Sequence, residues 1–236
     1  MPAVVSSVPQ FTETRDRAWH LSGWVSRRVV AGVSSRRLDL AQFLETLDPS
    51  TIPVEAEQVH GSSLAIIGRT ERSPRAIPGC DALLTQVPGI ALLVHTADCL
   101  PMLFADCARG VVGIAHVGWR GLVASLPARV VAAFRHMYQS RPAELSVAIG
   151  PAIRACCYEV GPEFSARFGP FVQTRSGRRT CDLVGIARDQ LARCGIRPTQ
   201  VLDTRACTAC DPQRWFSRRQ DGPGTGRLTS LILLRP

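Results

Sequence analysis

The chain contains no lysine, and all 28 of its Lys and Arg residues are arginine. This absence excludes P-loop lysines, Schiff-base lysines and lysine general bases. Arginine binds phosphate and carboxylate groups through its planar guanidinium, so the net charge of +9 suits an anionic substrate, or nucleic acid. A general replacement of lysine by arginine over a solvated surface explains the same composition.

Long hydrophobic runs are absent too. No uncharged apolar stretch reaches the roughly 18 residues that a membrane helix needs. Residues 1–17 lack the basic start and apolar stretch of a secretion signal. We therefore expect a cytoplasmic protein with no membrane partner. The nine cysteines are an odd number, which favours free thiols in a reducing compartment over a disulfide framework.

Aromatic residues are few, at 6% of the chain. Together with the absence of an RNA-binding motif, this argues against nucleic acid as the partner. A non-catalytic, arginine-rich nucleic-acid binder is still a hypothesis of another class. It predicts steeply salt-dependent binding that Cys99→Ala leaves intact.

The remaining composition is that of a packed globular chain. Its 236 residues, 45% of them hydrophobic, suffice for one large domain or two small ones. No repeat, low-complexity tract or linker divides the chain. Short apolar runs bounded by Gly, Pro and Asp predict buried strands at residues 91–95, 101–105, 111–116, 145–149, 200–203 and 228–234.

Helical patterns are fewer than strand patterns. Asp182 fits the N-cap of a helix that Gly195 ends. Residues 121–139 predict another helix, with Pro127 in its first turn or at a kink. Strand runs followed by helices, with hairpin-like spacing between residues 101 and 116, favour an α+β fold over a regular βαβ winding. We expect a single domain of mixed β-sheets flanked by helices.

Two histidines and a cysteine, His60, Cys99 and His116, lie at the ends of apolar runs. Their spacings of 39 and 17 residues are too long for a local metal loop, so they converge only if the fold joins three strand ends. A His, Cys, His set leaves one tetrahedral position open, as in a catalytic zinc site. Each residue taken alone is more often a packed or surface residue than a ligand.

Several segments together resemble one known family: EQVHG, DALLTQVPGIALLVHTADCLPMLFAD, AHVGWRGL, AIGPAI followed by YEVG, and RWFSRRQDGPGTGR. They are similar to the YfiH-like laccase-domain family, also called polyphenol oxidases. Its members are described as purine nucleoside phosphorylases with adenosine deaminase activity, and some as peptidoglycan editing factors. The resemblance runs from about residue 54 to 234. It implies one catalytic domain over residues 1–236, with 1–53 the least well matched part.

The resemblance implies a metal site on the residues that match the family's His, Cys and His, namely His60, Cys99 and His116. Zinc is the expected ion and copper the alternative. The implied reaction is phosphorolysis of adenosine or inosine, in which inorganic phosphate attacks the ribose and the purine leaves. Deamination of adenosine is the implied side activity. The partners would then be a small nucleoside and inorganic phosphate.

The phosphate ligands have to be arginines or backbone amides, because lysine is absent. Arg120 follows Trp119 close to His116, where its guanidinium could meet a phosphate or form a surface salt bridge. GPGTGR at residues 222–227 is equally consistent with a hairpin turn and with an anion-binding loop to which Thr225 and Arg227 contribute donors. The family's FSYRRD is FSRRQD here, so Arg218 replaces a tyrosine.

Two further hypotheses use the same residues. Cys99 could be a thiolate nucleophile, activated by His116, that hydrolyses an amide or ester in cell-wall precursors. A copper-dependent polyphenol oxidase is the other; five histidines are too few for a multicopper cluster, although Met102 could complete a single copper site. Met102 fits the core better. His95 and Asp98 could orient a metal ligand, or serve as a packed core histidine and a turn cap.

Four other cysteines are not expected to form a metal site. Cys207 and Cys210 form a C-x-x-C motif. Without a second pair, a zinc site is not expected there, and Cys207 fits a buried thiol before a turn. The adjacent Cys156 and Cys157 can bind metal or oxidise, but burial is the favoured interpretation.

Overall fold

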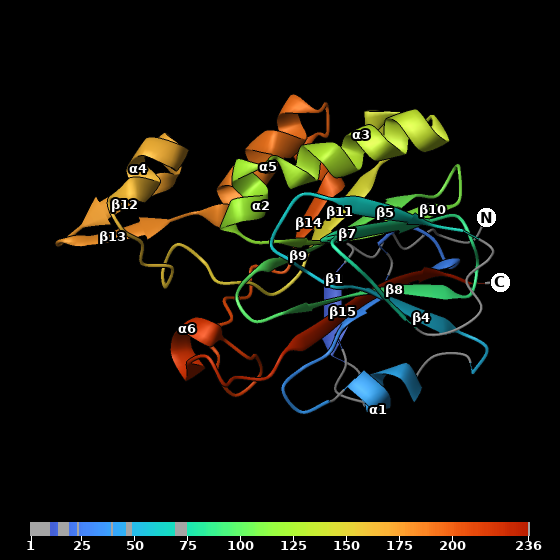
Figure 1. Cartoon of the computed structure of the whole chain (residues 1–236), viewed down its shortest axis with the longest axis horizontal. Coiled ribbons are helices and arrows are strands. Elements are labelled where there is room, and N and C mark those ends of the chain that lie inside the picture. Colours follow the sequence, from blue (N-terminus) through green and yellow to red (C-terminus); the bar gives the residue numbers. More distant parts are fainter. Residues whose placement is uncertain are drawn as a thin grey trace, which may run out of the picture.

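Two β-sheets packed face to face form the centre of the computed structural model, which describes residues 10–13, 19–22, 24–38, 40–45, 49–68 and 75–235 (Figure 1). The seven-stranded sheet has the order β1-β2-β3-β15-β8-β4-β6 and consists of β1 (Gln10–Glu13), β2 (Trp19–Ser22), β3 (Val29–Val33), β4 (Ile52–Ala56), β6 (Arg75–Ile77), β8 (Ile90–Thr96) and β15 (Leu228–Leu234). The six-stranded sheet has the order β14-β11-β9-β10-β7-β5 and consists of β5 (Leu64–Ile67), β7 (Ala82–Thr85), β9 (Leu100–Asp106), β10 (Val111–Val117), β11 (Ser146–Ile149) and β14 (Val201–Asp203). Strands β12 (Val172–Arg175) and β13 (Arg178–Cys181) pair as a separate hairpin.

Helices cover the outer faces of both sheets (Figure 1). The α-helices of the described residues are α1 (Leu40–Glu45), α2 (Trp119–Val123), α3 (Leu126–Tyr138), α4 (Glu163–Phe168), α5 (Leu183–Arg193) and α6 (Arg218–Asp221). Helices α2, α3 and α5 lie over the six-stranded sheet and α1 lies on the far side of the seven-stranded sheet, while α4 projects with the β12–β13 hairpin. Within the described ranges, no helix is long and apolar enough to cross a membrane.

Hydrophobic cores fill the spaces between these layers. Leu103 and Ile114 of the six-stranded sheet meet Leu92 and Ile232 of the seven-stranded sheet in the core between the two. On the outer face of the six-stranded sheet, Phe104 packs in a second core with the helices. Every residue of β9, β10 and β15 is therefore buried, which explains their continuous apolar runs, because a strand covered on both faces has no polar alternation.

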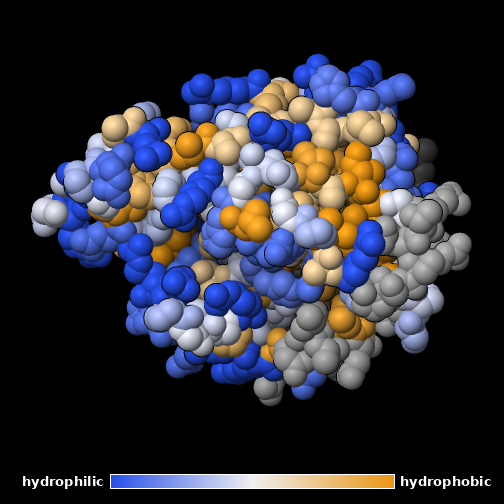
Figure 2. Space-filling view, viewed as in Figure 1, coloured by the Kyte–Doolittle hydropathy of each residue, from blue (hydrophilic) through white to orange (hydrophobic). Residues whose placement is uncertain are grey.

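The outer surface carries few large apolar side chains. On the face shown in Figure 2, hydrophilic residues predominate and hydrophobic ones form smaller patches. Val59, Ile66, Val123 and Met137 are the large hydrophobic residues exposed in the described part of the chain. The apolar residues thus lie mainly in the cores, where each fully buried Leu, Ile or Phe side chain contributes about 1.5–3 kcal/mol.

The predicted fold class is confirmed, since mixed sheets flanked by helices form one α+β domain. All six predicted strands are present, and β9 and β10 pair as the expected antiparallel hairpin. Asp182 caps α5 by accepting a hydrogen bond from Gly185 N. The prediction of one helix over residues 121–139 was wrong. The chain forms α2 and α3 instead, because Ser125 adopts a left-handed conformation with φ +58°, and Pro127 lies in the first turn of α3.

The chain crosses between the two sheets twice at the same edge. Strands β4 and β8 are parallel neighbours, so both end at one edge of the seven-stranded sheet. Each then continues into the six-stranded sheet, through residues 57–63 to β5 and through 97–99 to β9. Because β10 runs antiparallel to β9, with Val117 opposite Leu100, its end returns to this edge. Three segments distant in sequence therefore meet there.

Candidate functional site

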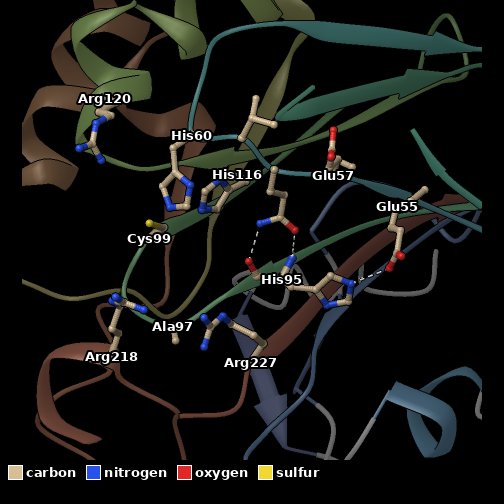
Figure 3. Close-up of a pocket in the computed structure, with 14 residues that line it drawn as sticks. Glu55, Glu57, His60, His95, Ala97, Cys99, His116, Arg120, Arg218 and Arg227 are labelled. Carbon is tan, nitrogen blue, oxygen red and sulfur yellow. Dashed lines mark hydrogen bonds and ion pairs between the residues drawn. The ribbon is translucent and has the colours of Figure 1, made fainter. Parts of the chain in front are cut away.

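His60, Cys99 and His116 come together where the chain crosses between the sheets. His60 lies in the first crossing, Cys99 in the second, and His116 at the end of β10. Their side chains point toward one another (Figure 3). All three ligand atoms lie within 4.8 Å of one another. The sheet topology thus brings together three residues that are separated by 39 and 17 positions in the sequence.

Asp81 holds both histidines, although sequence reasoning did not single it out. Its fully buried carboxylate accepts hydrogen bonds from His60 N at 3.0 Å and from Gly61 N at 2.7 Å. The same carboxylate pairs with His116 Nδ1 at 2.8 Å. His60 has φ +59°, an uncommon conformation that these contacts help to stabilise. Asp81 therefore fixes the loop of one histidine and the ring of the other.

The imidazole of His116 is oriented for binding through Nε2. Asp81 occupies Nδ1, which leaves Nε2 on the side of the other two residues. The ring is buried, and it lies 4.7 Å from the His60 ring, edge to face. A carboxylate behind a ligand histidine fixes its tautomer and raises its basicity. The arrangement is that of a metal ligand with its supporting acid.

Cys99 and His116 also form a reactive pair. Burial opposes ionisation of Cys99, but hydrogen bonds from His116 and His60 outweigh it and lower the pKa of the thiol to about 6. Burial likewise opposes protonation of His116, yet Asp81 and Cys99 raise the pKa of the imidazole to about 9. The site therefore favours a thiolate at neutral pH, the form in which cysteine binds metals and attacks electrophiles.

The residues fit one zinc or copper ion. Two imidazoles and a thiolate are the ligands that zinc and copper prefer. Donor atoms no more than 4.8 Å apart are within reach of a single ion with ligand bonds of about 2.0–2.3 Å. His60 is exposed and Cys99 half-buried, so one side of the set is open. An open fourth position is typical of catalytic zinc sites.

A cavity of about 840 Å³ lies on that open side. Its polar lining residues are Glu55, Glu57, Gln58, His60, His95, Cys99, His116, Arg120, Arg218 and Arg227. In Figure 3 the three arginine side chains surround the His–Cys–His set, with Arg120 on one side and Arg218 and Arg227 on the other. The cavity thus joins a potential metal centre to a basic wall.

Of the three residues expected to bind phosphate, two line the cavity and one does not. Arg120 lines the cavity and its guanidinium lies 4.5 Å from the Trp119 ring centroid. Arg227 lines it too, and donates to the carbonyls of Thr225 at 2.7 Å and of Gly226 at 3.0 Å. Thr225 itself is not among the lining residues; its hydroxyl donates to Asp221 at 2.9 Å. The GPGTGR segment connects α6 to β15, so the hairpin interpretation was wrong.

None of the described hydrogen bonds joins His95 or Asp98 to His60 or His116. His95 pairs with Glu55 at 2.8 Å and with Thr229 Oγ1 at 3.1 Å, and it faces the cavity. Asp98 accepts hydrogen bonds from Thr208 and Ser217 hydroxyls at 2.7 Å and from Arg219 N at 2.7 Å. Asp98 thus serves the capping role, at the start of α6.

Other lining residues escaped the sequence analysis because no local motif marks them. The amide of Gln58 donates to His95 O at 2.6 Å and accepts from His95 N at 2.7 Å, so it fixes the first crossing to β8 (Figure 3). Arg218 was visible only as the residue that replaces a tyrosine in FSYRRD. Glu55 and Glu57 lie on or just after β4, a strand that the apolar runs did not reveal.

The sequence matches the family described as "Multi-copper polyphenol oxidoreductase laccase" over residues 29–235. The chain belongs to this family. It is 32% identical over 219 residues to "Purine nucleoside phosphorylase YlmD" of Geobacillus stearothermophilus, covering 85% of this chain and 78% of the relative. It is 36% identical over 191 residues to "Purine nucleoside phosphorylase YfiH" of Escherichia coli strain K12, covering 77% and 74%. These matches confirm the predicted YfiH-like family.

Another relative carries a different activity in its name. "Adenosine deaminase RL5", from an unknown prokaryotic organism, is 30% identical over 211 residues, 83% of this chain and 79% of the relative. Among solved structures, that of YlmD from Geobacillus stearothermophilus superimposes with a TM-score of 0.89 at 25% identity, covering 97% of this chain and all of the other. The α+β fold is therefore that of the family.

The multi-copper part of the family description is not matched by a histidine cluster in the described residues. All five histidines are described, and only His60 and His116 belong to a group that could hold a metal. His136 is exposed on α3, and Met102 is fully buried in the core, as expected for a packing residue. Among the described residues, the histidines can therefore take part in one metal site, the set of His60, Cys99 and His116.

Proposed function

We propose that this chain is a metal-dependent purine nucleoside phosphorylase that acts on adenosine and inosine, with adenosine deamination as a side activity. One observation carries the proposal: His60, Cys99 and His116 converge beside an 840 Å³ cavity whose wall carries arginines. A nucleoside and a phosphate fit a cavity of this size. The names of the relatives YlmD, YfiH and RL5 support the choice of reaction.

The metal would be held by His60, Cys99 and His116, with zinc the expected ion and copper the alternative. When bound, it supplies a Lewis acid that lowers the proton affinity of an attacking oxygen. Asp81 keeps the His116 ring in place. The chain's own contribution at this point is a thiolate and two oriented imidazoles, preorganised before substrate arrives.

The arginines would bind and orient inorganic phosphate. Arg120, Arg218 and Arg227 present guanidinium groups to the cavity from separate elements, so they can contact different phosphate oxygens. In phosphorolysis a phosphate oxygen forms a bond to the anomeric carbon of the ribose while the bond from that carbon to the purine nitrogen breaks. Holding the two reactants in line is what the arginines contribute to the rate.

The leaving purine needs a proton, and the His95–Glu55 pair is the group we assign to proton transfer. His95 Nε2 lies 2.8 Å from Glu55 Oε2, and both residues line the cavity. A carboxylate behind an imidazole fixes the orientation of the ring, as general acid–base catalysis requires. This role is independent of the metal ligands, since His95 lies across the cavity from them (Figure 3).

A phosphate titration tests the proposal. Purified protein with adenosine or inosine should release the base only when inorganic phosphate is present, and should form ribose 1-phosphate. Deamination of adenosine should proceed without phosphate, and a metal-stripped sample should do neither. Base release that is flat from zero to millimolar phosphate would replace phosphorolysis by hydrolysis at the same site.

A thiol hydrolase of cell-wall precursors is the second candidate, favoured by the lowered pKa of Cys99 beside His116. The two functions respond oppositely to reagents. Chelator followed by zinc should abolish and restore a metal enzyme, whereas a thiol hydrolase ignores chelator and is inactivated by iodoacetamide. Absence of reaction with every purine nucleoside would favour this second candidate.

A further inference from the structure

Four cysteines from two distant segments gather outside the cavity. Cys156 and Cys157 lie in the turn after β11, and Cys207 and Cys210 in the turn after β14. Their sulfur atoms all lie within 4.8 Å of one another. The interpretation of Cys156 and Cys157 as buried thiols was wrong, since Cys156 is exposed and Cys157 half-buried. The missing second pair for the C-x-x-C motif is this adjacent pair.

The sulfur separations are those of ligands around one small ion. Cys156 Sγ lies 3.7 Å from Cys207 Sγ and 3.6 Å from Cys210 Sγ, and Cys157 Sγ lies 3.3 Å from Cys210 Sγ. Ligands on a tetrahedral zinc with Zn–S bonds of about 2.3 Å are about 3.8 Å apart. All four thiols are free in the structure. The geometry therefore approximates an S₄ tetrahedron.

Backbone hydrogen bonds hold the two cysteine-bearing turns in place. Cys210 N donates to Cys207 O at 3.3 Å, which closes the C-x-x-C turn. Ala152 and Cys207 form a parallel bridge, and Thr208 N donates to Ala152 O at 3.1 Å. The C-x-x-C turn therefore supplies two ligands in a fixed orientation beside the segment that leads to Cys156 and Cys157.

We propose that Cys156, Cys157, Cys207 and Cys210 hold a structural zinc ion, a site separate from the one in the cavity. Binding of Zn²⁺ would release four thiol protons to solvent and leave all four positions of the tetrahedron occupied by sulfur. The set is closed: it has four protein ligands and leaves no position for substrate. We call these four residues the cysteine clasp.

The clasp joins two turns that are hydrogen-bonded, through Asp98 and Arg219, to segments that line the cavity. Thr208, between the two ligands of the second turn, donates to Asp98, which directly precedes Cys99. Arg219 donates to Glu159 O at 2.6 Å and to Asp98 through its N–H. A metal in the clasp would therefore fix both the second crossing and α6, whose Arg218 lines the cavity.

Metal analysis of a double variant tests the clasp without interference from the cavity site. His60→Ala/His116→Ala protein, expressed with zinc and purified without chelator, should retain about one zinc per chain. Adding Cys157→Ser and Cys210→Ser should remove that zinc and lower the Tm by about 5 °C or more. Adding Cys107→Ser instead is the matched control, because this exposed thiol lies at the β9–β10 turn, and should change neither value.

Alkylation of the wild-type protein gives a second measurement that needs no variant. Iodoacetamide at about pH 9, where these thiols begin to ionise, followed by peptide mass spectrometry should leave the four clasp cysteines unmodified in the zinc-bound protein, and chelator should raise their modification several-fold. Equal alkylation with and without chelator would overturn the proposal. So would disulfides among the four residues in protein purified anaerobically, or a double variant that neither carries zinc nor takes it up.

Discussion

The two thiol-containing clusters of this protein differ in their side chains and in their access to the cavity. The cavity site combines one cysteine with two histidines, leaves one side open and faces three arginines. The clasp has four cysteines, supplied by two turns, and no cavity residue among them. In zinc proteins an open fourth position is typical of catalytic sites and four cysteine ligands are typical of structural sites, so we assign the two clusters to these different roles. Variants should separate these roles.

The largest effect is expected from Cys99→Ser. Removing the thiolate should release the cavity metal and lower base release by roughly 1000-fold or more, because a bound Lewis acid contributes several kcal/mol to the transition state. The Tm should change little, since the clasp is intact. Activity assays with parallel metal analysis and calorimetry check this. A Cys99→Ser protein that retains full metal content and activity would contradict the assignment of the cavity cluster as the catalytic metal site.

The two kinds of thiol should also differ in alkylation rate by about 100-fold near pH 7, because the roughly 10⁴-fold larger thiolate fraction of Cys99 is partly offset by the lower nucleophilicity of a low-pKa thiolate. In metal-stripped protein, Cys99 has its pKa lowered to about 6, so it is a thiolate above that pH and loses reactivity as the pH falls below 6. Burial and the neighbouring Cys210 and Cys207 raise the pKa of Cys156 to about 11, which keeps it protonated. Rates measured by mass spectrometry from pH 5 to 8 give both profiles; equal rates at pH 7 would contradict the assignment.

Asp81→Asn should lower activity by about 10–100-fold, because loss of a carboxylate behind a ligand histidine weakens the metal site by that factor. It should also raise the pKa of Cys99, since the His116 cation would lose its partner. Clasp zinc should be unaffected. Asp106→Asn is the matched control: Asp106 is equally buried, at the opposite end of β9. Similar losses in both variants would indicate a general effect of removing a buried charge.

Arg227→Ala should raise the KM for phosphate by about tenfold, with a smaller effect on the nucleoside KM, because a charge-assisted hydrogen bond contributes about 1.5–3 kcal/mol at most. Arg120→Ala is the parallel test beside Trp119. Arg135→Ala, an exposed residue on α3, should change neither constant. Initial rates across a phosphate series measure the split. A change in the nucleoside KM alone would assign Arg227 to the other substrate.

The fold was predictable where strands are covered on both sides. Continuous apolar runs revealed β8, β9, β10 and β15. One face of each of these strands packs against the other sheet and the opposite face packs against helices, so most positions along the strand must be apolar. Strands such as β6, with exposed residues, gave no such run. The helix break at Ser125 was also hidden, since a left-handed residue that is not glycine has no compositional sign.

The convergence of His60, Cys99 and His116 could be anticipated from their strand-end positions and from the family resemblance. Asp81 could not, because its role depends on where β7 begins relative to β10, and an aspartate before a strand resembles a turn residue. The clasp was missed for a similar reason. Its second pair is two adjacent cysteines about 50 residues before Cys207, and the two turns meet only because β11 and β14 pair in parallel, a pairing that the bridge between Ala152 and Cys207 continues.

The position of β15 has a consequence for how the molecule acquires its shape. This strand lies between β3 and β8 in the seven-stranded sheet, and Leu234 pairs with Val29, about 200 residues earlier. Pairings across such separations form slowly, because a long loop must close first. On the ribosome, β3 and β8 emerge well before the strand that joins them. One edge of β3 and one edge of β8 therefore stay without their native partner until β15 is synthesised, and unpaired strand edges favour aggregation.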